Sequence, residues 1–420
     1  MKSIVVAGNV KYWEEDTGGK SRVGRLCEHL RKSGFAVSYF MTCDLSDADR
    51  RMLDERYPHE TLLYVQPTGA TSASLMRYAA GNSESMMELN LLDPVFACVY
   101  DPRSRTEPIA ASNGPEPRLE SWYSRHHDIA FKAMCLHTRP DFVIVQRVIY
   151  GYLVEGIGKY SANTKTLVDT LDVLYRRYEA FHRNGQPHWL QITEEEEKGC
   201  LKHFDVIIAI QEKEASIFRS MVPDKKVITA GHSCPVQPGP ENLIDENTVL
   251  FVSSQNRPGL KAITLFAQNV WPDVLRASGG KAVLKILGKV CHFIEPGRLG
   301  PNIEQLGFVP DLKPFYESAA IVINPADFGG GLKIKNVEAL CHGKPLLTTS
   351  VGAEGLEAGA NRAFLICNTP EEFRKRLVAL ILDPVQRKEL SVQALEFART
   401  RFAPKAAYSE LMRVLNPGID

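Results

Sequence analysis

Short apolar runs rich in β-branched residues alternate with amphipathic stretches along the whole chain. In the first half these runs predict seven strands, at 3–8, 35–41, 61–66, 141–146, 166–172, 205–210 and 226–231. In the second half they predict five more, at 249–254, 282–288, 320–324, 345–349 and 364–367. Nearly continuous apolar strands that alternate with helices are typical of a parallel sheet covered on both faces. The pattern therefore predicts an α/β protein.

A stretch with little periodicity separates the two series of strands. Residues 232–248 hold three Pro and one Gly, which favours an interdomain linker. A length of 420 residues also fits two domains. We expect a first domain at 1–235 and a second at 236–400, joined by a hinge with little buried area to resist rotation. Residues 99–125 are rich in Pro, Ser and charge and predict a loop within the first domain.

Charge and cysteine content exclude several classes of protein. Fifty basic residues balance fifty acidic ones, which argues against a general nucleic-acid binder and leaves room only for a local basic pocket. The nine Cys are odd in number, form no CxxC pair and lie mostly in apolar runs, which indicates reduced thiols in a cytoplasmic protein. No apolar run approaches the roughly 20 residues that span a bilayer. We expect a cytoplasmic protein, with peripheral membrane contact left open.

The segment 321–356 carries the strongest chemical signal. A predicted strand leads into Gly329, Gly330 and Gly331, and a helical pattern follows with Lys333 and Lys335 in its predicted first turn. Glycines before a helix let a ligand approach the backbone, and the free amides of a helix N-terminus favour an anion such as a phosphate. Two solvated lysines on an ordinary turn are the structural alternative, and the residues alone leave both open.

Glu338 follows Lys335 at i+3 spacing on the same predicted helix. A carboxylate there can accept both hydroxyls of a ribose. On spacing alone, a surface ion pair with Lys335 is the more ordinary interpretation.

A second glycine-rich helix start lies in the first domain. Gly18 and Gly19 precede a helical pattern with Lys20 and Arg22 in its first turn, and a plain helix cap explains them in isolation. If the two sheets face each other with their carboxyl edges, where open α/β sheets bind ligands, both turns would meet across one cleft.

The remaining candidates are weaker. Asp169 and Asp172 have a spacing that metal pairs use, but no third ligand is near, so we expect no metal. The histidines 126, 127 and 137 match no metal spacing, and His232 lies at the domain junction.

The residues that resemble a known family come mainly from the second half. PADFGGGLKIKNVEALCHGKPLLTTSVGAEGLE resembles the donor-site signature of glycosyltransferase family 4, whose members have the GT-B fold. VLFVSSQNRPGLKAI, VLKILG and GFVPDLKPFYESAAIVINP are similar to other segments of that family, and so are DTGGKSRVGRLCEHLRKSGFAV and TLVDTLDVLYRRYEAF in the first half. The resemblance is strong over 249–400 and weak over 40–140. It implies two Rossmann-like doubly wound domains that face each other across a cleft, with residues 401–420 packing back on the first domain.

The resemblance also implies an activity, namely transfer of a sugar from a nucleoside diphosphate sugar to an acceptor hydroxyl with retention of configuration. The acceptor would be a glycan, a lipid-linked sugar or a small molecule, in polysaccharide or glycoconjugate biosynthesis. No cofactor and no metal would be needed, because cations and amides stabilise the departing diphosphate. Neither a nucleic acid nor a pair of glycosidase-type carboxylates would take part.

Each implied role falls on residues of the matching motifs. Glu338 would hold the ribose, the backbone at 307–309 would flank the base, and Asp172 would orient or deprotonate the acceptor. The groups implied on the diphosphate are Arg257, Lys261, Lys333, Lys335 and the amides of Gly329, Gly330 and Gly331. Those implied at the base are Gly307, Phe308 and Val309, and those implied on the acceptor side are Gly18, Gly19 and Lys20.

Two departures from the family pattern matter. The family's Glu-seven residues-Glu pair would place its first Glu at position 330, where this chain has Gly330. The donor sugar would then be contacted by Asp327 or by amides at Ala353 and Glu354. The strand that often ends in His here offers only Asp172, which could equally be a helix N-cap.

Three other functions stay open at this point. A non-catalytic protein of the same fold is compatible with Gly330 and the missing His. A nucleotide-sugar 2-epimerase would need several His and Arg donor-site residues that are absent here, and a glycan phosphorylase would need a longer chain with a cofactor lysine.

Overall fold

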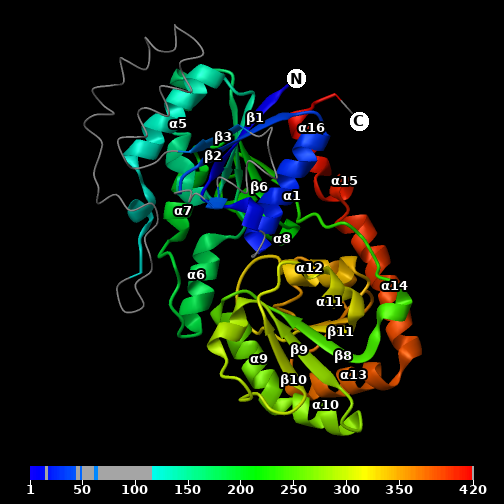
Figure 1. Ribbon diagram of the computed structural model, residues 1–420. Coiled ribbons are helices and arrows are strands. Elements are labelled where there is room, and N and C mark those ends of the chain that lie inside the picture. Colours follow the sequence, from blue (N-terminus) through cyan, green and yellow to red (C-terminus); the bar gives the residue numbers. More distant parts are fainter. Residues whose placement is uncertain (15–17, 44–47, 50–60, 65–115, 419–420) are drawn as a thin grey trace.

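The computed structural model describes residues 1–14, 18–43, 48–49, 61–64 and 116–418 (Figure 1). These residues form two α/β domains, one above the other in Figure 1, with a parallel sheet in each. The cysteines that the structure describes are all free, and most are buried. Both predictions, α/β class and two parallel sheets, are confirmed.

The first domain holds a seven-stranded sheet of order β3-β2-β1-β4-β5-β6-β7. Every neighbouring pair in it is parallel. The strands are β1 (Ser3–Gly8), β2 (Ala36–Met41), β3 (Thr61–Tyr64), β4 (Phe142–Gln146), β5 (Lys165–Asp169), β6 (Val206–Ala209) and β7 (Lys226–Thr229). All seven were predicted; the last two residues of the predicted strand 61–66 lie outside the described residues.

Helices cover both faces of this sheet because alternate strand residues point to opposite faces. One face packs on α5 (Arg125–Thr138), α6 (Leu174–Arg183), α7 (Glu194–Leu201) and α8 (Glu212–Met221). The other packs on α1 (Gly18–Lys32) and on α16 (Ser409–Leu415), a helix from the far end of the chain. The return of the last helix to the first domain is therefore confirmed.

The second domain holds a six-stranded parallel sheet of order β10-β9-β8-β11-β12-β13. Its strands are β8 (Asp245–Val252), β9 (Val283–Leu287), β10 (Ile303–Gly307), β11 (Ala319–Asn324), β12 (Leu346–Thr348) and β13 (Leu365–Ile366). Five were predicted, and β10 was missed. This edge strand alternates between half-buried and exposed residues, so it lacks the apolar run that marks the others.

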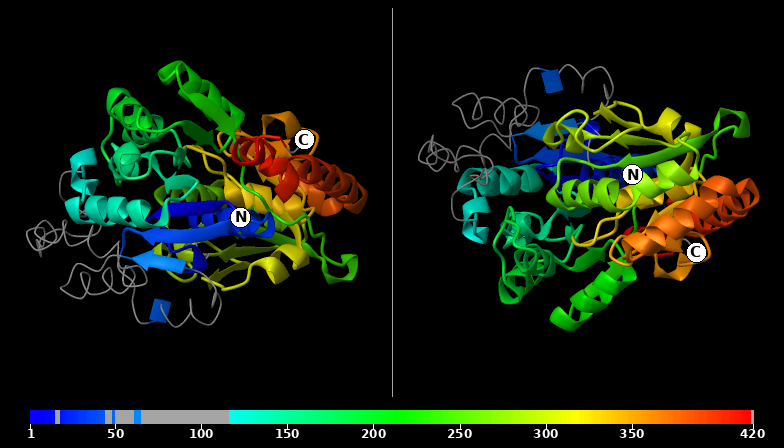
Figure 2. Two further views of the ribbon diagram at one scale, coloured as in Figure 1. Left: turned by 90° about the horizontal axis from the view of Figure 1, so that it is seen from above. Right: turned by 90° about the horizontal axis from the view of Figure 1, so that it is seen from below.

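Two sets of helices cover this second sheet. One face packs on α9 (Arg257–Asn269), α10 (Trp271–Ala277) and α13 (Pro370–Leu382). The other packs on α11 (Lys313–Ser318), α12 (Ile334–Cys341) and α14 (Pro384–Arg401). In Figure 2 α14 runs along the side of the second domain, and α15 (Pro404–Ala407) then leads to α16.

The linker between the sheets corrects one expectation. Its first residues are buried, because the Cys234 amide donates to the Phe402 carbonyl at 2.9 Å and the Gln237 amide to that of Cys341 at 3.0 Å. The Ser233 hydroxyl also bonds Tyr408. The prediction of a hinge with little buried area is wrong for this part, because the returning C-terminal segment packs on it.

Candidate active site in the cleft between the domains

Two adjoining cavities lie between the domains, of about 430 and 280 Å³. Both are lined by residues that follow sheet strands or begin helices in each domain. They share Ser253, at the end of β8, and Glu338, on α12. We call the larger the transfer cavity and the smaller the base cavity.

The glycine turn forms one wall of the transfer cavity. Gly329 and Gly331 have φ of 115° and 72°, conformations that favour glycine. The sequence predicts both lysines in the first helical turn, but α12 begins at Ile334, so Lys333 precedes it as the N-cap residue. Lys335 does lie in the first turn, where the amides lack partners within the helix.

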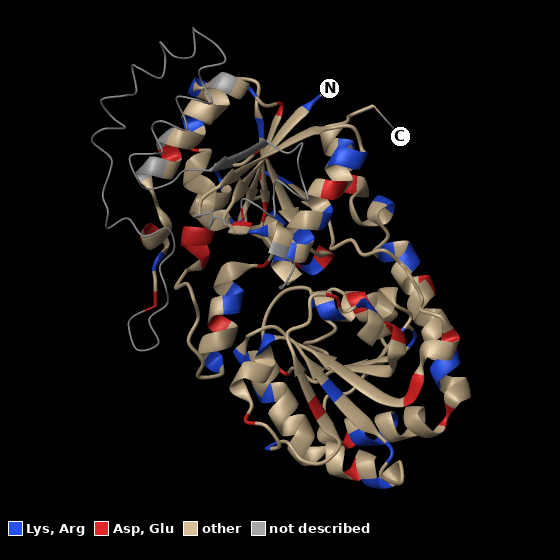
Figure 3. Cartoon of the chain, in the orientation of Figure 1, with Lys and Arg blue, Asp and Glu red and all other residues tan. Residues whose placement is uncertain are grey.

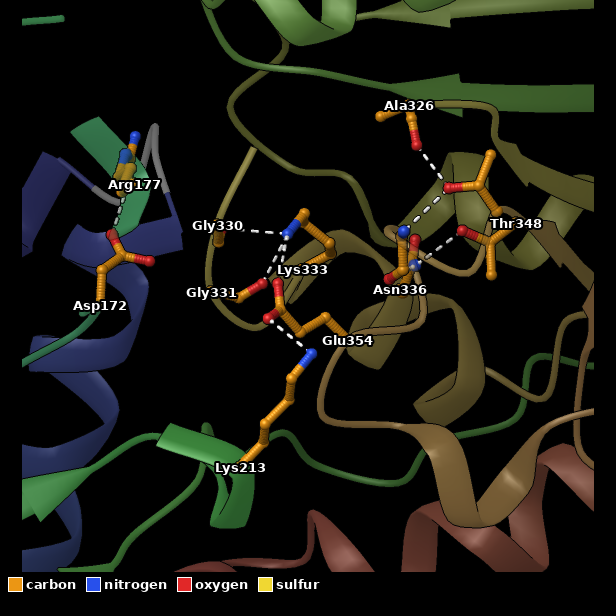
Figure 4. A network of polar contacts seen from close by, with 12 residues as sticks. Asp172, Arg177, Lys213, Ala326, Gly330, Gly331, Lys333, Asn336, Thr348 and Glu354 are labelled. Carbon is orange, nitrogen blue, oxygen red and sulfur yellow. Dashed lines mark hydrogen bonds and ion pairs between the residues drawn. The ribbon is translucent and has the colours of Figure 1, made fainter. Parts of the chain in front are cut away.

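The Lys333 ammonium group is hydrogen-bonded to the glycine turn itself. Its Nζ donates to the carbonyls of Gly330 at 2.9 Å and Gly331 at 2.6 Å, and lies 3.9 Å from Glu354 (Figure 4). Burial lowers the pKa of Lys333, although the carboxylates of Glu354 and Asp172 oppose the shift. Lys333 therefore shapes the turn and adds positive charge beside the cavity.

Lys335 is the cation with fewer partners. Its Nζ lies 3.4 Å from the Ser253 hydroxyl and 5.2 Å from the centre of the Phe251 ring. Burial, and then the neighbouring charge of Lys333, lower the pKa of Lys335 to about 8. A buried cation with so few partners is suited to an anionic ligand.

Glu338 lies at the junction of the two cavities. Its Oε2 accepts from the Tyr316 hydroxyl at 3.2 Å, and Tyr316 stacks on His342. Phe308 and Val309 line the base cavity beside it, so three residues implied at the ribose and base do come together. Gly307, which precedes them at the end of β10, does not line it.

A buried polar network holds α12 against the ends of β11 and β12. The Asn336 amide donates to Thr348 at 3.2 Å and to the Gly352 carbonyl at 2.8 Å, and accepts from Asn324 at 3.0 Å (Figure 4). A Cβ on Gly352 would lie 2.0 Å from the Thr348 hydroxyl, so glycine is required there. The network fixes the helix N-terminus at the carboxyl edge of the sheet.

The facing wall comes from the first domain and touches the glycine turn. A Cβ on Gly331 would lie 1.9 Å from Asp172 Oδ1, so only glycine lets this carboxylate approach. Asp172 forms an ion pair with Arg177, whose side chain would contact a Cβ on Gly330 at 3.4 Å. Gly330, the departure from the family pattern, therefore faces an arginine of the other domain.

Asp172 does not cap the helix that follows it. The N-cap residue of α6 is Val173, and the buried Glu197 accepts from the Leu174 and Tyr175 amides at 3.0 and 2.9 Å. The alternative of Asp172 as an N-cap is wrong, because α7 supplies the cap. Burial raises the pKa of Glu197 to about 7.

The first-domain wall rests on a buried ion pair. Arg22, from α1, binds Asp169 at the end of β5 through two nitrogens, the shorter contact being 2.7 Å, and donates to the Ala230 carbonyl at 2.8 Å. Both side chains are fully buried. Asp169 is thus a structural partner of Arg22.

The second glycine-rich turn also reaches the cleft. Gly18 and Gly19 line the transfer cavity, and a Cβ on Gly18 would lie 2.8 Å from Ile334, the first residue of α12. The starts of α1 and α12 therefore meet across the cleft, as expected from the sequence. Lys20 follows them in α1 but does not line either cavity.

Several predicted donor residues lie beside the glycine turn but outside the two cavities. Lys261 pairs with Asp327 at 2.8 Å, and Arg257 is exposed at the start of α9; neither lines the cavities. The Ala353 and Glu354 amides donate to carbonyls of their own turn. The Glu354 side chain instead contacts Lys333, and it contacts Lys213 of α8 across the domains at 3.4 Å. The sugar contacts expected from Asp327, Ala353 or Glu354 stay a prediction.

The structure adds residues that the sequence did not single out. Arg147, Arg177, Trp189 and Ser253 line the transfer cavity, and Tyr316 lines the base cavity. Glu214, of α8, is buried beside Lys333 and Glu354, and burial raises its pKa well above the usual value. A usable signal was the position of Arg147 directly after the predicted strand 141–146, since ligands bind at carboxyl edges.

Comparison with known proteins agrees with the geometry. Residues 246–383 match the family model of glycosyl transferases group 1. Sucrose-phosphate synthase from Thermosynechococcus elongatus superimposes with a TM-score of 0.70 at 15% identity, over 99% of this chain and 98% of that one. The chain has the GT-B fold. The resemblance seen in the sequence is thereby confirmed, whereas membership of family 4 itself stays a prediction.

Further relatives support the same fold. TarM from S. aureus, solved as a mutant in complex with fondaparinux, alpha-GlcNAc-glycerol and UDP, gives a TM-score of 0.67 at 12% identity over 99% of this chain and all of that one. HepE from Anabaena, solved with UDP and glucose, gives 0.65 at 12% over 99% of each chain. A Klebsiella pneumoniae protein described as an uncharacterized 44.6 kDa protein in the cps region is 26% identical over 103 residues, 24% of this chain and 26% of that protein.

Two further findings concern metals and membranes. Among the described residues no group of three His, Cys, Asp or Glu side chains is placed to hold a metal ion, and metal-independent activity stays a prediction. No helix in the described part of the chain has the length and hydropathy needed to cross a membrane.

Proposed function

We propose that this protein is a retaining glycosyltransferase that moves a sugar from a nucleoside diphosphate sugar to a hydroxyl of a glycan or glycoconjugate, without a metal. The proposal rests on one observation, namely that the walls contributed by the two domains meet at the transfer cavity. The start of α12, with Lys335 and Glu338, faces Asp172 and the start of α1 across one cavity. The similarity of residues 246–383 to group 1 glycosyl transferases supports the donor half of the proposal.

On the donor side each cavity takes a part of the nucleotide. The base lies against Phe308 and Val309, and Glu338 accepts the ribose hydroxyls where the cavities join. The diphosphate lies at the amides of the glycine turn and of α12, with Lys335 as its main cation and Lys333 holding the turn. UDP in the TarM and HepE structures supports a nucleoside diphosphate as the ligand.

On the acceptor side the chemistry needs little acid–base machinery. The bond between the anomeric carbon and the phosphate oxygen breaks, and the acceptor oxygen forms its bond on the same face. Its proton passes to the departing phosphate oxygen. Lys335 and the amides stabilise the charge that grows on the leaving group. Asp172, held by Arg177, orients the acceptor hydroxyl.

Calorimetric titration with UDP and GDP tests the donor half. Glu338→Ala removes two charge-assisted hydrogen bonds to the ribose and should weaken the preferred nucleotide by about 1.5–3 kcal/mol, roughly 10- to 150-fold. The matched control is Glu304→Ala, which removes an exposed carboxylate of the same domain on β10 and should leave affinity unchanged. Equal affinity of Glu338→Ala and the parent protein for both nucleotides would rule out the ribose role.

A non-catalytic protein of the same fold is the second candidate, and Gly330 is the observation that favours it. Nucleotide binding alone is expected of both candidates. Release of free sugar or glycosyl transfer from a panel of nucleotide sugars, in the presence of EDTA, separates them. Binding without any turnover across the panel would favour the non-catalytic alternative.

A further inference from the structure

One cation of the transfer cavity lies on the first-domain wall, away from the proposed diphosphate site, and has no carboxylate partner among the described residues. Five cations line this cavity, namely Arg22, Arg147, Arg177, Lys333 and Lys335, against the carboxylates of Asp172 and Glu338. Three of these cations already have carboxylate partners. Arg22 pairs with Asp169, Arg177 with Asp172, and Lys333 lies near Glu354. Lys335 faces the diphosphate, which leaves Arg147 without a counter-charge.

Arg147 is fixed in place by its surroundings. It follows β4 directly, with a φ of 74° that is rare for a residue other than glycine, and its amide donates to the Asp169 carbonyl at 2.9 Å. Its guanidinium lies over the Trp189 ring, 5.4 Å from the ring centre. Within the described part of the chain this guanidinium has no hydrogen-bond or ion-pair partner.

A stacked guanidinium suits one kind of ligand. Arginine held on an aromatic ring keeps its planar fork of donors free, and that fork fits a carboxylate or a phosphate through two parallel hydrogen bonds. Arg177 lines the same cavity, and its Nε is buried without a partner, so a second donor is available. Both residues belong to the first domain, on the wall opposite the proposed donor groups.

We propose that Arg147, assisted by Arg177, binds an anionic group of the acceptor, so that this protein glycosylates an acidic saccharide. The inference rests on the proposed function, because it assigns the acceptor class of the same cleft. The anionic group is a carboxylate, as in a uronic acid, or a phosphate ester. Arg147 acts by binding the acceptor, and the donor nucleotide does not touch it.

Titration of the UDP-saturated protein with three probes tests the proposal. UDP first fills the diphosphate site, so that an anion cannot bind there. Glucuronate, glucose 6-phosphate and glucose are then titrated and followed by ligand-observed NMR. We expect at least one acidic sugar to bind about tenfold or more tightly than glucose. Preferential binding of glucuronate identifies the anionic group as a carboxylate, and preferential binding of glucose 6-phosphate identifies it as a phosphate.

Variants of Arg147 assign the preference to this residue. Arg147→Gln should abolish the preference for the acidic sugar, and Arg147→Lys should restore only part of it, because a lysine cannot form the two parallel bonds. The matched control is Arg183→Gln, at the exposed end of α6, where the side chain donates a hydrogen bond to the Glu179 carbonyl. Unchanged UDP affinity in every variant shows that each of them folds.

Two outcomes would overturn the proposal. One is an equal affinity for acidic and neutral sugars, and the other is a preference that survives Arg147→Gln. Loss of UDP affinity in Arg147→Gln would place the residue on the donor side and would also overturn it. If the parent protein fails to bind UDP, the proposed function fails instead. The same titration in the Lys333→Ala/Lys335→Ala protein without nucleotide then judges the anion site by itself.

Discussion

The donor wall of the cleft comes mainly from one segment, residues 330–338, joined by residues 252–254 and Leu312, whereas the first-domain wall is assembled from parts of the chain that lie farther apart. Gly18 begins α1, Arg147 follows β4, Asp172 follows β5, and Trp189 lies beyond α6. Charged residues lie over both domains (Figure 3), yet Arg22 of the first-domain wall and Lys335 of the donor wall are held in opposite ways. Arg22 is paired with Asp169 through two of its nitrogens, whereas the Lys335 ammonium group contacts the Ser253 hydroxyl at 3.4 Å.

This difference separates a cation that stabilises the fold from a cation that is available to a ligand. A buried cation whose charge is neutralised by the protein stabilises the fold, because the pair replaces lost hydration. A buried cation left without a counter-charge costs stability and gains it back only from an anionic ligand. Under the proposed function, Lys335 of the donor wall therefore holds charge for a substrate, and Arg22 holds charge for the fold.

Removing each cation should have opposite effects on folding. Arg22→Met leaves Asp169 buried and unpaired and should lower the free energy of unfolding by about 3–5 kcal/mol. Lys335→Met removes a buried charge that has few partners and should raise stability at pH 7. Urea unfolding at pH 7 measures both, with Arg25→Met as control because its pair with Glu28 is on the surface. A large loss of stability in Lys335→Met would break the contrast.

The lysines of the donor wall should matter for turnover even though Lys335 lowers stability. The double substitution Lys333→Ala/Lys335→Ala removes the positive charge at the leaving group and should lower kcat about 10²- to 10³-fold, more than it raises KM. Steady-state kinetics measure this, with the exposed Lys281→Ala as control. Full turnover in the double variant would mean that amides alone stabilise the leaving group.

The two walls also differ in how far the sequence could predict them. The glycine turn and its lysines were recognised from their pattern, because these groups are close in sequence, whereas the ribose role of Glu338 came from the resemblance. Arg147 and Trp189 were missed, since only the order of the strands brings them together. Arg257 and Lys261, which the resemblance implies on the diphosphate, do not line the cavities, and spacing gave no sign that Lys261 would pair with Asp327.

Apolar patterns predicted every buried strand but not β10, whose residues alternate and stay half exposed. The base cavity was therefore recognised from resemblance rather than from pattern. The network around Asn336 was also invisible, because its partners lie on strands far along the chain.

Two adjacent glycines test how closely the walls must meet. Gly331→Ala would place a Cβ 1.9 Å from Asp172 at a φ of 72°, so we expect the domains to be held apart and kcat to fall about tenfold or more. Gly330→Ala meets Arg177 at 3.4 Å with an ordinary φ and should be tolerated. Solution scattering should show UDP reducing the radius of gyration of the parent and of Gly330→Ala, but less that of Gly331→Ala. An equal decrease in the radius of gyration of both variants would contradict the contact between Gly331 and Asp172.

The pH dependence of kcat/KM for the donor is the smallest and most specific of the expected effects. The pKa of Lys335 is lowered from 10.5 to about 8, so the free enzyme loses this charge as the pH rises through about 8. At pH 9 about a tenth of the molecules keep it, and kcat/KM should fall about tenfold. The limb in kcat should lie at higher pH, because a bound diphosphate raises the pKa of Lys335.

The contribution of Lys335 to the free energy of unfolding should change in the opposite direction to kcat/KM as the pH rises. Between about pH 8 and 10.5 the unfolded chain binds a proton that folded Lys335 lacks, so this group's contribution to stability rises with pH. Lys335→Arg keeps its charge and should remove the alkaline limb of kcat/KM. A parent enzyme whose kcat/KM stays level to pH 10, or a limb that persists unchanged in Lys335→Arg, would show that another group controls donor capture. The contrast between the two walls would then hold for folding but not for the substrate.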